Sequence, residues 1–308
     1  MKRIWTAAIT AAALLLGGCA GGADEGTGTA QPSAGGPSYP VTVGSLTLEK
    51  RPERIVSLSP TATEMLFALD AGPQVTAVDD QSTYPAEAPR TDLSSFKPNA
   101  EAVAAKNPDL VVVSDDLDKI VAQLTALKIP VFHAPAAKSL DDTYTQIGQL
   151  GALTGHPGEA TALTGRMRAD ITAIVQGVPK RAKPLTYYYE LDPTLYSVTS
   201  KTFIGSLLSP LGLTSVADAA DPDGAKGGYP QLSQEALVGA DPALIFLADT
   251  KCCKQSAATV QARKGWSGIS AVRTGRIVAI DDDIASRWGP RVVDLVRTAA
   301  DAVADVPA

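Results

Sequence analysis

Short apolar runs rich in β-branched residues alternate with helical patterns in the first half of the chain. The pattern predicts strands at residues 54–58, 75–79, 109–114 and 129–133, and helices at residues 61–69, 99–106, 117–127 and 139–154. Strands that alternate with helices predict a mainly parallel sheet covered on both faces.

The second half repeats this alternation. Predicted strands cover residues 185–190, 196–199, 243–247 and 277–280, and predicted helices cover residues 202–211, 233–238, the stretch before Trp266, and residues 290–303. Each half is expected to form a Rossmann-like α/β lobe, at residues 46–155 and 180–308.

A longer helical pattern lies between the two halves. Apolar residues recur at helical spacing after Pro157 (Ala160, Leu163, Met167, Ile171 and Ile174). A helix of this length, at about 1.5 Å per residue, reaches roughly 33 Å. We therefore expect a single helix over residues 156–179 to join the lobes and to leave a ligand cleft between them.

One segment of the first half is similar to a segment of the second. Residues 101–113 align with residues 235–247, and each reads as a short helix, a turn that contains proline, and a buried strand. Glu101 and Glu235 begin the two segments. The match favours a duplicated lobe.

The N-terminus carries an export pattern. Lys2 and Arg3 precede an apolar stretch that is too short to span a bilayer comfortably, and small residues lead to Cys19. This arrangement predicts a lipoprotein signal peptide at residues 1–18 and acylation of Cys19. Residues 19–45, rich in Gly, Ala, Ser, Thr and Pro up to residue 40, are expected to form a flexible tether. The folded part would then lie at the outer face of a bacterial cytoplasmic membrane.

Composition excludes several classes of protein. The 308 residues include 27 basic and 33 acidic side chains, a net charge of −6, and the isoelectric point is near 5.0. A nucleic-acid-binding surface needs a basic face, so we expect no nucleic-acid partner. With two histidines and three cysteines, no multi-histidine or four-cysteine metal site is possible, and we expect no metal site.

Enzymatic motifs are missing from the sequence. There is no Gly-x-Ser-x-Gly elbow, no phosphate-binding loop and no dinucleotide fingerprint. His133 and His156 are expected to be structural or solvated. The run Asp281–Asp283 is interpreted as a solvated acidic strand end, with a cation site as the alternative.

Aromatic residues on Gly- and Pro-containing loops suggest a recognition surface. Tyr84, Phe96, Tyr229 and Trp288 all lie on predicted loops, and exposed aromatic rings suit a large amphipathic ligand. The segment from Ser59 and Pro60 to Thr61 and Glu64 fits a capping box that starts a helix. Its free backbone N–H groups would be available to polar ligand groups.

These motifs together resemble a known family, the substrate-binding proteins of cobalamin and iron-siderophore ABC importers, and within it most closely the cobalamin binders. The resemblance extends from residue 51 to the C-terminus. It is carried by residues 57–64, the Tyr84-Pro85 loop, and residues 99–114, 229–235 and 287–291.

The resemblance implies a solute-binding protein that is not an enzyme and has no catalytic residue or cofactor apart from its cargo. It implies two lobes with little hinge motion and a monomer that docks onto a permease dimer with its ATPase subunits. Glu101 and Glu235 would dock onto permease arginines.

The resemblance also places ligand contacts. Tyr84 and Phe96 would lie on the rim of the first lobe, and Tyr196, Tyr229 and the loop from Asp283 to Arg287 on the second, next to Trp288. The sequence departs from the cobalamin binders, since Phe96 and Tyr229 stand where they carry tryptophan and Ser286 where they carry glutamate.

Two other functions remain as alternatives. Arg287 and Arg291 keep an anionic ferric siderophore, or haem, as a cargo of the same machinery, because arginine pairs with carboxylate or catecholate oxygens. Arg291 is expected instead to neutralise carboxylates within its own lobe. An extracytoplasmic hydrolase is the rival from another class.

Cys252 and Cys253 are adjacent in the chain. Neighbouring Cα atoms lie about 3.80 Å apart, less than a disulfide usually spans. A strained vicinal disulfide, a reduced pair or mixed disulfides are all open.

Overall fold

Four parallel strands form the sheet of the first lobe. The computed structural model describes residues 38–307, and all four strands lie where the sequence predicts them. They are β3 (Ile55–Leu58), β4 (Val75–Val78), β5 (Leu110–Val113) and β6 (Val131–His133), in the spatial order β4-β3-β5-β6. Strands β3 and β5 are buried along their whole length, and β5 therefore reads in the sequence as a continuous apolar run, whereas β3 contains the buried Ser57.

Helices cover this sheet, and each predicted helix is present. They are α1 (Pro60–Ala68), α2 (Ala100–Ala104), α3 (Ile120–Ala126) and α4 (Leu140–Thr154), with 3₁₀ turns at Gly72–Gln74 and Leu117–Lys119. Helix α4 begins with a capping box between Ser139 and Asp142 and ends at Gly155, whose φ of 85° lies in the left-handed region.

The sheet of the second lobe is also parallel. Its strands are β7 (Leu185–Glu190), β8 (Leu213–Ser215), β9 (Leu244–Leu247) and β10 (Ile277–Ala279), in the order β10-β9-β7-β8. The predicted strand at residues 196–199 is wrong. That segment bonds instead to the loop at residues 228–231, since the N–H groups of Ser197 and Thr199 donate to the carbonyls of Pro230 and Gly228. β8 takes the position beside β7.

The helices of the second lobe are shorter. They are α6 (Phe203–Leu208), α7 (Gln234–Ala240), α8 (Ala257–Gln261), α9 (Ser270–Arg273), α10 (Asp282–Ala285) and α11 (Val292–Ala304), with 3₁₀ turns at Ser209–Leu211 and Val216–Ala220. Helix α6 ends before its predicted limit because Pro210 follows in the 3₁₀ turn. Helices α9 and α10, each of four residues, were not predicted from the sequence.

The internal repeat is visible in the topology. Numbered along the chain within each lobe, both sheets have the order 2-1-3-4. The matched segments are α2 with β5 and α7 with β9, and Glu101 and Glu235 are each the second residue of their helix. Asn99 and Ser233 cap these helices by accepting hydrogen bonds from Ala102 N and Ala236 N. The two lobes are therefore built on one plan.

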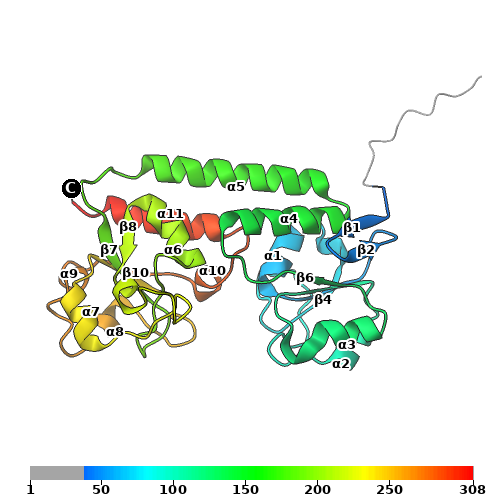
Figure 1. Ribbon diagram of the computed structural model, residues 1–308, viewed down its shortest axis with the longest axis horizontal. Coiled ribbons are helices and arrows are strands. Elements are labelled where there is room, and N and C mark those ends of the chain that lie inside the picture. The colour runs from blue at the N-terminus through cyan, green and yellow to red at the C-terminus, as the bar shows by residue number, and fades with distance from the viewer. Residues whose placement is uncertain (1–37, 308) are drawn as a thin grey trace, which may run out of the picture. The chain divides into compact units, whose positions relative to one another are not determined.

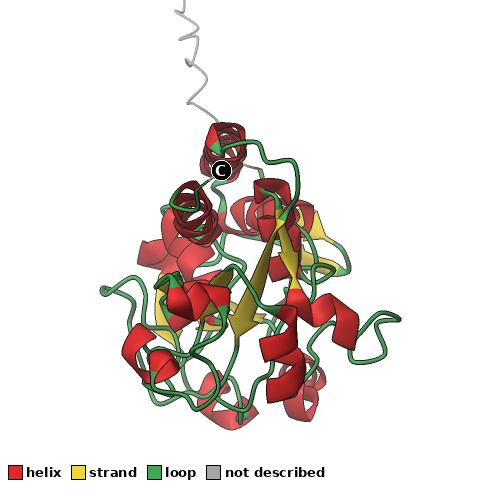
Figure 2. Cartoon of the chain, turned by 90° about the vertical axis from the view of Figure 1, so that its left-hand side faces the viewer, coloured by secondary structure: helices red, strands yellow, loops and turns green. Residues whose placement is uncertain are grey.

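Helix α5 (Pro157–Gly177) joins the lobes. It runs alongside α4 of the first lobe and α11 of the second (Figure 1). Viewed from the end, the strands lie among surrounding helices (Figure 2). Ala160, Leu163 and Met167 of α5 belong to one hydrophobic core that also contains α1 and α4 residues of the first lobe and α11 residues of the second. This shared core couples the two lobes.

A small hairpin precedes the first lobe. Strands β1 (Val41–Val43) and β2 (Leu46–Leu48) pair through a turn at Gly44, whose φ is 58°. Strand β1 therefore lies inside the range predicted as tether, residues 19–45. The signal peptide, Cys19 and the tether up to residue 37 lie outside the described residues. Among the described helices, none has the length and apolar character needed to cross a membrane.

Candidate ligand-binding site between the lobes

Helix α1 begins at the carboxyl end of β3, where the site starts. Ser59 is its N-cap and accepts a hydrogen bond from Ala62 N, and Pro60 occupies the first turn. The capping box predicted at Thr61 and Glu64 is wrong, because Ser59 does the capping and the Glu64 carboxylate points elsewhere.

Glu64 is clamped by two arginines of the second lobe. Arg287 Nη1 lies 2.8 Å from Glu64 Oε1, and Arg291 donates from Nε and Nη2 at 2.9 and 2.5 Å. The Glu64 side chain is 2% exposed and that of Arg287 is 9% exposed. The expectation that Arg291 neutralises carboxylates of its own lobe is wrong, because its partner lies on α1 of the first lobe. These bonds satisfy a buried charge that would otherwise be costly.

Asp283 holds the same cluster from the other side. Its Oδ1 accepts from Arg287 Nη2 at 2.8 Å, and its Oδ2 accepts from Lys251 Nζ at 2.8 Å and Thr83 Oγ1 at 3.0 Å. Burial alone would raise the pKa of Asp283, but hydrogen bonding from Lys251 and the charge of Arg287 hold that pKa below its usual value. Asp283 thus links the lobes a second time.

The acidic run of which Asp283 is part is half-buried and paired within the second lobe. Asp281 accepts a hydrogen bond from Lys251 Nζ at 2.6 Å. Asp282 accepts from the hydroxyl of Thr250 and from the backbone N–H groups of Lys251 and Cys252. Among the described residues, no group of three His, Cys, Asp or Glu is placed to hold a metal ion.

A cavity of about 280 Å³ opens beside this cluster. Seven of the ten predicted ligand residues line it: Ser59, Pro60, Thr61, Phe96, Asp283, Arg287 and Trp288. Ser286, which belongs to the predicted loop from Asp283 to Arg287, also lines it, and the remaining lining residues, Gln81, Ser95, Ser114 and Asp115, were not predicted. Both lobes contribute to the wall, as the predicted cleft requires.

Two aromatic residues differ in how the cavity holds them. The Trp288 indole N–H donates to Gln146 Oε1 of α4 at 2.9 Å, so its ring is fixed across the lobes. Phe96 is 69% exposed. An exposed ring of this size at a cavity is a surface that a ligand can cover.

The three predicted tyrosines lie outside the cavity lining. Tyr84 stacks under the guanidinium of Arg291, 4.3 Å from its ring centre, and lines a separate cavity with Glu64. Tyr196 pairs with Gln231 in an isolated bridge, and Tyr229 follows two glycines of positive φ. All three side chains are between 41% and 48% exposed.

The sequence signals for Glu64, Gln146 and Lys251 were weak. Glu64 was predicted only as part of a capping box, and Gln146 and Lys251 have no local pattern. Glu64 and Gln146 are revealed by their partners in the second lobe, and Lys251 by its ion pairs with Asp281 and Asp283. Glu101 and Glu235 are exposed, and in Figure 1 their helices α2 and α7 both lie on the side away from α5.

Neither histidine is placed as a catalytic base in this cavity. His133 Nε2 lies 3.2 Å from the carbonyl of Ser114. His156 Nε2 lies 2.7 Å from Arg51 Nη2 and 3.1 Å from Gln74 Oε1, where the chain enters α5.

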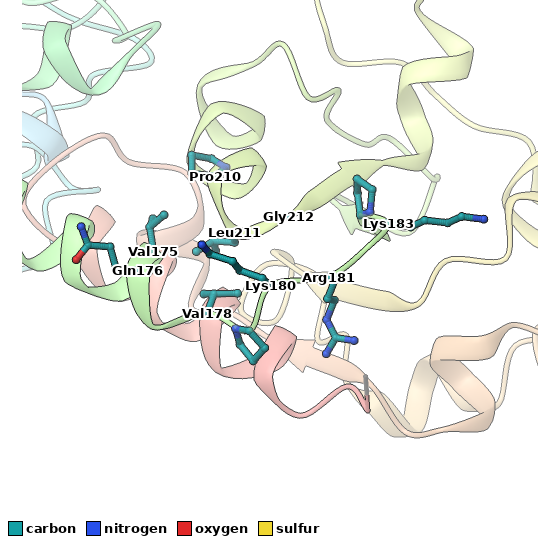
Figure 3. Close-up of a pocket in the computed structure, with 11 residues that line it drawn as sticks. Val175, Gln176, Val178, Lys180, Arg181, Lys183, Pro210, Leu211 and Gly212 are labelled. Carbon is teal, nitrogen blue, oxygen red and sulfur yellow. The ribbon is translucent and has the colours of Figure 1, made fainter.

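A larger cavity of about 600 Å³ lies at the end of α5 (Figure 3). Lys180, Arg181 and Lys183 line it together with apolar residues such as Val175 and Leu211. The Arg181 guanidinium is already engaged, since it donates to the backbone carbonyls of Val303, Val306 and Pro307 at the end of α11. No predicted site residue reaches this cavity, so size alone does not locate the site.

Comparison with known proteins identifies the fold and the family. Residues 55–284 match the periplasmic binding protein family. The chain belongs to this family. It is 30% identical over 314 residues to the uncharacterized ABC transporter substrate-binding lipoprotein YvrC of Bacillus subtilis, covering 97% of this chain and 96% of that protein. It is 32% identical to the cobalamin-binding protein of Halobacterium salinarum, covering 86% and 74% of the two chains.

Solved structures of periplasmic binding proteins share the fold. The haem-binding protein RhuT of Roseiflexus has a TM-score of 0.72 at 24% identity and covers 82% of this chain and 98% of its own. The vitamin B12-binding protein BtuF of Vibrio cholerae has a TM-score of 0.67 at 22% identity, with coverage of 82% and 96%. Periplasmic binding proteins of this kind are solute binders rather than enzymes. They lie outside the cytoplasm and work with an ABC permease and its ATPase.

Proposed function

We propose that this periplasmic binding protein captures a corrinoid of the cobalamin type and delivers it to an ABC permease. The supporting observation is that the arginines at the cavity are already paired with carboxylates of the protein. The charged residues that line the cavity are Asp115, Asp283 and Arg287, and Arg287 is already paired with Glu64 and Asp283.

An anionic cargo would need a free cation in the wall. Arg291, the second arginine near the cavity, is also committed to Glu64. Ferric siderophores with carboxylate or catecholate groups, and haem with its propionates, would therefore meet a lining that carries an excess of acid. Cobalamin is large, amphipathic and close to neutral, and it suits aromatic and hydroxyl groups.

The cavity accommodates one edge of such a ligand. Its volume of about 280 Å³ lies near the lower limit for small-molecule sites, roughly 300 Å³. Ser59, Thr61, Ser95 and Ser114 would offer hydrogen bonds to amide side chains of the corrin ring. The exposed rings of Phe96, Tyr196 and Tyr229 would cover the remainder of the ligand.

Delivery would use the two exposed glutamates. Glu101 and Glu235 occupy equivalent places in the two lobes, and matched carboxylates suit matched arginines on a permease dimer. In this proposal the protein acts as a monomer, and acylated Cys19 holds it at the outer face of the cytoplasmic membrane.

Calorimetric titration of the chain from residue 20 onward tests the cargo. Saturable one-to-one binding of cyanocobalamin is expected, with no turnover of the ligand. A ferric hydroxamate and haem are titrated in parallel. Binding of either one with no response to cyanocobalamin would overturn the corrinoid assignment, and turnover of any of these ligands would overturn the solute-binding role itself.

A further inference from the structure

Two adjacent cysteines lie in a loop next to the cavity. The loop, which we call the cysteine loop, comprises residues 249–256 between β9 and α8. Cys252 is exposed, Cys253 is half-buried, and their Sγ atoms face each other at 2.6 Å. Neither residue has a part in the proposed ligand contacts.

Hydrogen bonds hold the backbone of both cysteines in place. The N–H of Cys252 donates to Asp282 Oδ2 at 2.9 Å, and the N–H of Cys253 donates to the carbonyl of Asp249 at 3.2 Å. Gln255 Nε2 donates to the carbonyl of Cys253 at 3.0 Å. The backbone around the two cysteines is thus fixed, which lowers the entropy cost of joining the sulfurs.

The cysteine loop is connected to the cavity through Lys251. The Lys251 ammonium lies 2.6 Å from Asp281 Oδ1 and 2.8 Å from Asp283 Oδ2. Asp283 lines the cavity and orients Arg287. A change in the position of the loop therefore reaches the ion pairs between the lobes.

The compartment of the protein favours a disulfide between the two cysteines. Extracytoplasmic proteins meet oxidising conditions in which disulfides form and persist.

We propose that Cys252 and Cys253 form a reversible vicinal disulfide outside the membrane, and that this bond adjusts the cavity through Lys251 and Asp283. In the reaction, the two thiols pass two electrons and two protons to the disulfide of an extracytoplasmic thiol–disulfide oxidant, which leaves as two thiols. The new S–S bond closes a small ring across one peptide unit. Strained, exposed disulfides are the labile and regulatory ones.

Thiol labelling of the full chain tests the bond. The protein is extracted in detergent without reductant and treated with N-ethylmaleimide before or after reduction, and the fragment that contains residues 252–253 is weighed, which keeps Cys19 out of the measurement. The fragment is expected to be lighter than its dithiol form by two hydrogens. It should take up two maleimides, and only after reduction. Labelling of both cysteines without reduction, or a disulfide to another chain, would overturn the proposal.

Hydrogen exchange tests the connection to the cavity without any ligand. Reduction is expected to speed amide exchange several-fold in residues 281–287 of the wild type. In Lys251→Gln, and in the double variant Cys252→Ser/Cys253→Ser, the same treatment should change nothing. Equal exchange in oxidised and reduced wild type would overturn the regulatory part.

Ligand affinity is the third readout, and only this one rests on the proposed function. The dissociation constant for cyanocobalamin is expected to change several-fold on reduction in the wild type and not in Lys251→Gln. An unchanged constant in reduced wild type overturns regulation of binding. A failure of cyanocobalamin to bind either form would overturn the cargo assignment, while labelling and hydrogen exchange still decide the bond.

Discussion

Arg291 reaches from the second lobe to Glu64 of the first, with Nε 2.9 Å from Oε2 and Nη2 2.5 Å from Oε1. The same guanidinium covers the ring of Tyr84. Hydrogen bonding to Glu64 raises the pKa of Arg291 further. This pair and Arg287 tie the cavity wall together across the lobes, so the two sides of the site are held at a set spacing before a ligand arrives.

Replacing Glu64 with glutamine should strongly destabilise the protein. The change removes the counter-charge of Arg291 and leaves Arg287 with Asp283 as its remaining partner, and removing one partner of a buried pair costs about 3–5 kcal/mol. The free energy of unfolding is measured by urea denaturation. The matched control is Asp141→Asn, which breaks an exposed pair with Arg168 and should cost less than about 1 kcal/mol. Equal effects of the two variants would contradict a structural role for the clamp.

His156 should make stability depend on pH at mildly acidic values. Burial and the neighbouring Arg51 lower the pKa of His156 below its ordinary value of 6.5. The contribution of neutral His156 to the free energy of unfolding is fully present above pH 6.5. It is lost as the pH falls toward the lower pKa of the folded state, because the unfolded chain binds the proton first. Unfolding free energies between pH 5 and 8 should show a shallower slope in His156→Gln than in the wild type. An unchanged slope in His156→Gln would contradict this role of His156.

Asp249 should act in the opposite direction. Burial, with the nearby Glu190, raises the pKa of Asp249 to about 7 from an ordinary 3.8, and both its carboxylate oxygens lack a hydrogen-bond partner among the described residues. The contribution of Asp249 to the free energy of unfolding is fully present below its ordinary pKa and is lost as the pH rises through the pKa of the folded state. Asp249→Asn should therefore raise the melting temperature by a few degrees at pH 8 and by less at pH 5. A larger gain at pH 5 would show that the sign is wrong.

Phe96 and Tyr229 should carry ligand affinity without carrying stability. Phe96 is 69% exposed and Tyr229 is 46% exposed, so Phe96→Ala and Tyr229→Ala should leave the melting temperature close to that of the wild type. Loss of a covering ring should weaken cyanocobalamin binding by about tenfold, the equivalent of about 1.4 kcal/mol. Leu127→Ala, which removes an exposed apolar side chain outside the cavity lining, is the control for calorimetry. Wild-type affinity in both aromatic variants would remove these residues from the site.

Glu101 and Glu235 should matter for transport and not for binding. Alanine at either position removes an exposed carboxylate that lies outside the cavity lining, so the dissociation constant should stay at the wild-type value. Uptake of labelled cobalamin by cells that carry the cognate permease should fall severalfold, and further in the double variant. Asp301→Ala, an exposed acid on α11, is the control. Normal uptake with Glu235→Ala would contradict the docking role.

The local pattern of the sequence determined much of this protein. Continuous apolar runs predicted the buried strands β5 and β9, because the side chains on both faces of a strand covered on both sides are apolar. Spacing predicted α5, and the repeat of residues 101–113 at 235–247 predicted two lobes of one plan. The exposed Phe96 and Tyr229 followed from Gly and Pro in their loops.

The tertiary structure decided which residues from distant parts of the chain contact one another. The run at residues 196–199 looks like a strand, but bonds from Ser197 and Thr199 to a distant loop take its backbone away from the sheet, and β8 pairs with β7 instead. Glu64 and Arg291 are separated by most of the chain, so nothing in the sequence near either residue predicts their contact. Local propensities decide where strands and helices form, whereas the partner of a buried charge depends on which lobe is folded against it.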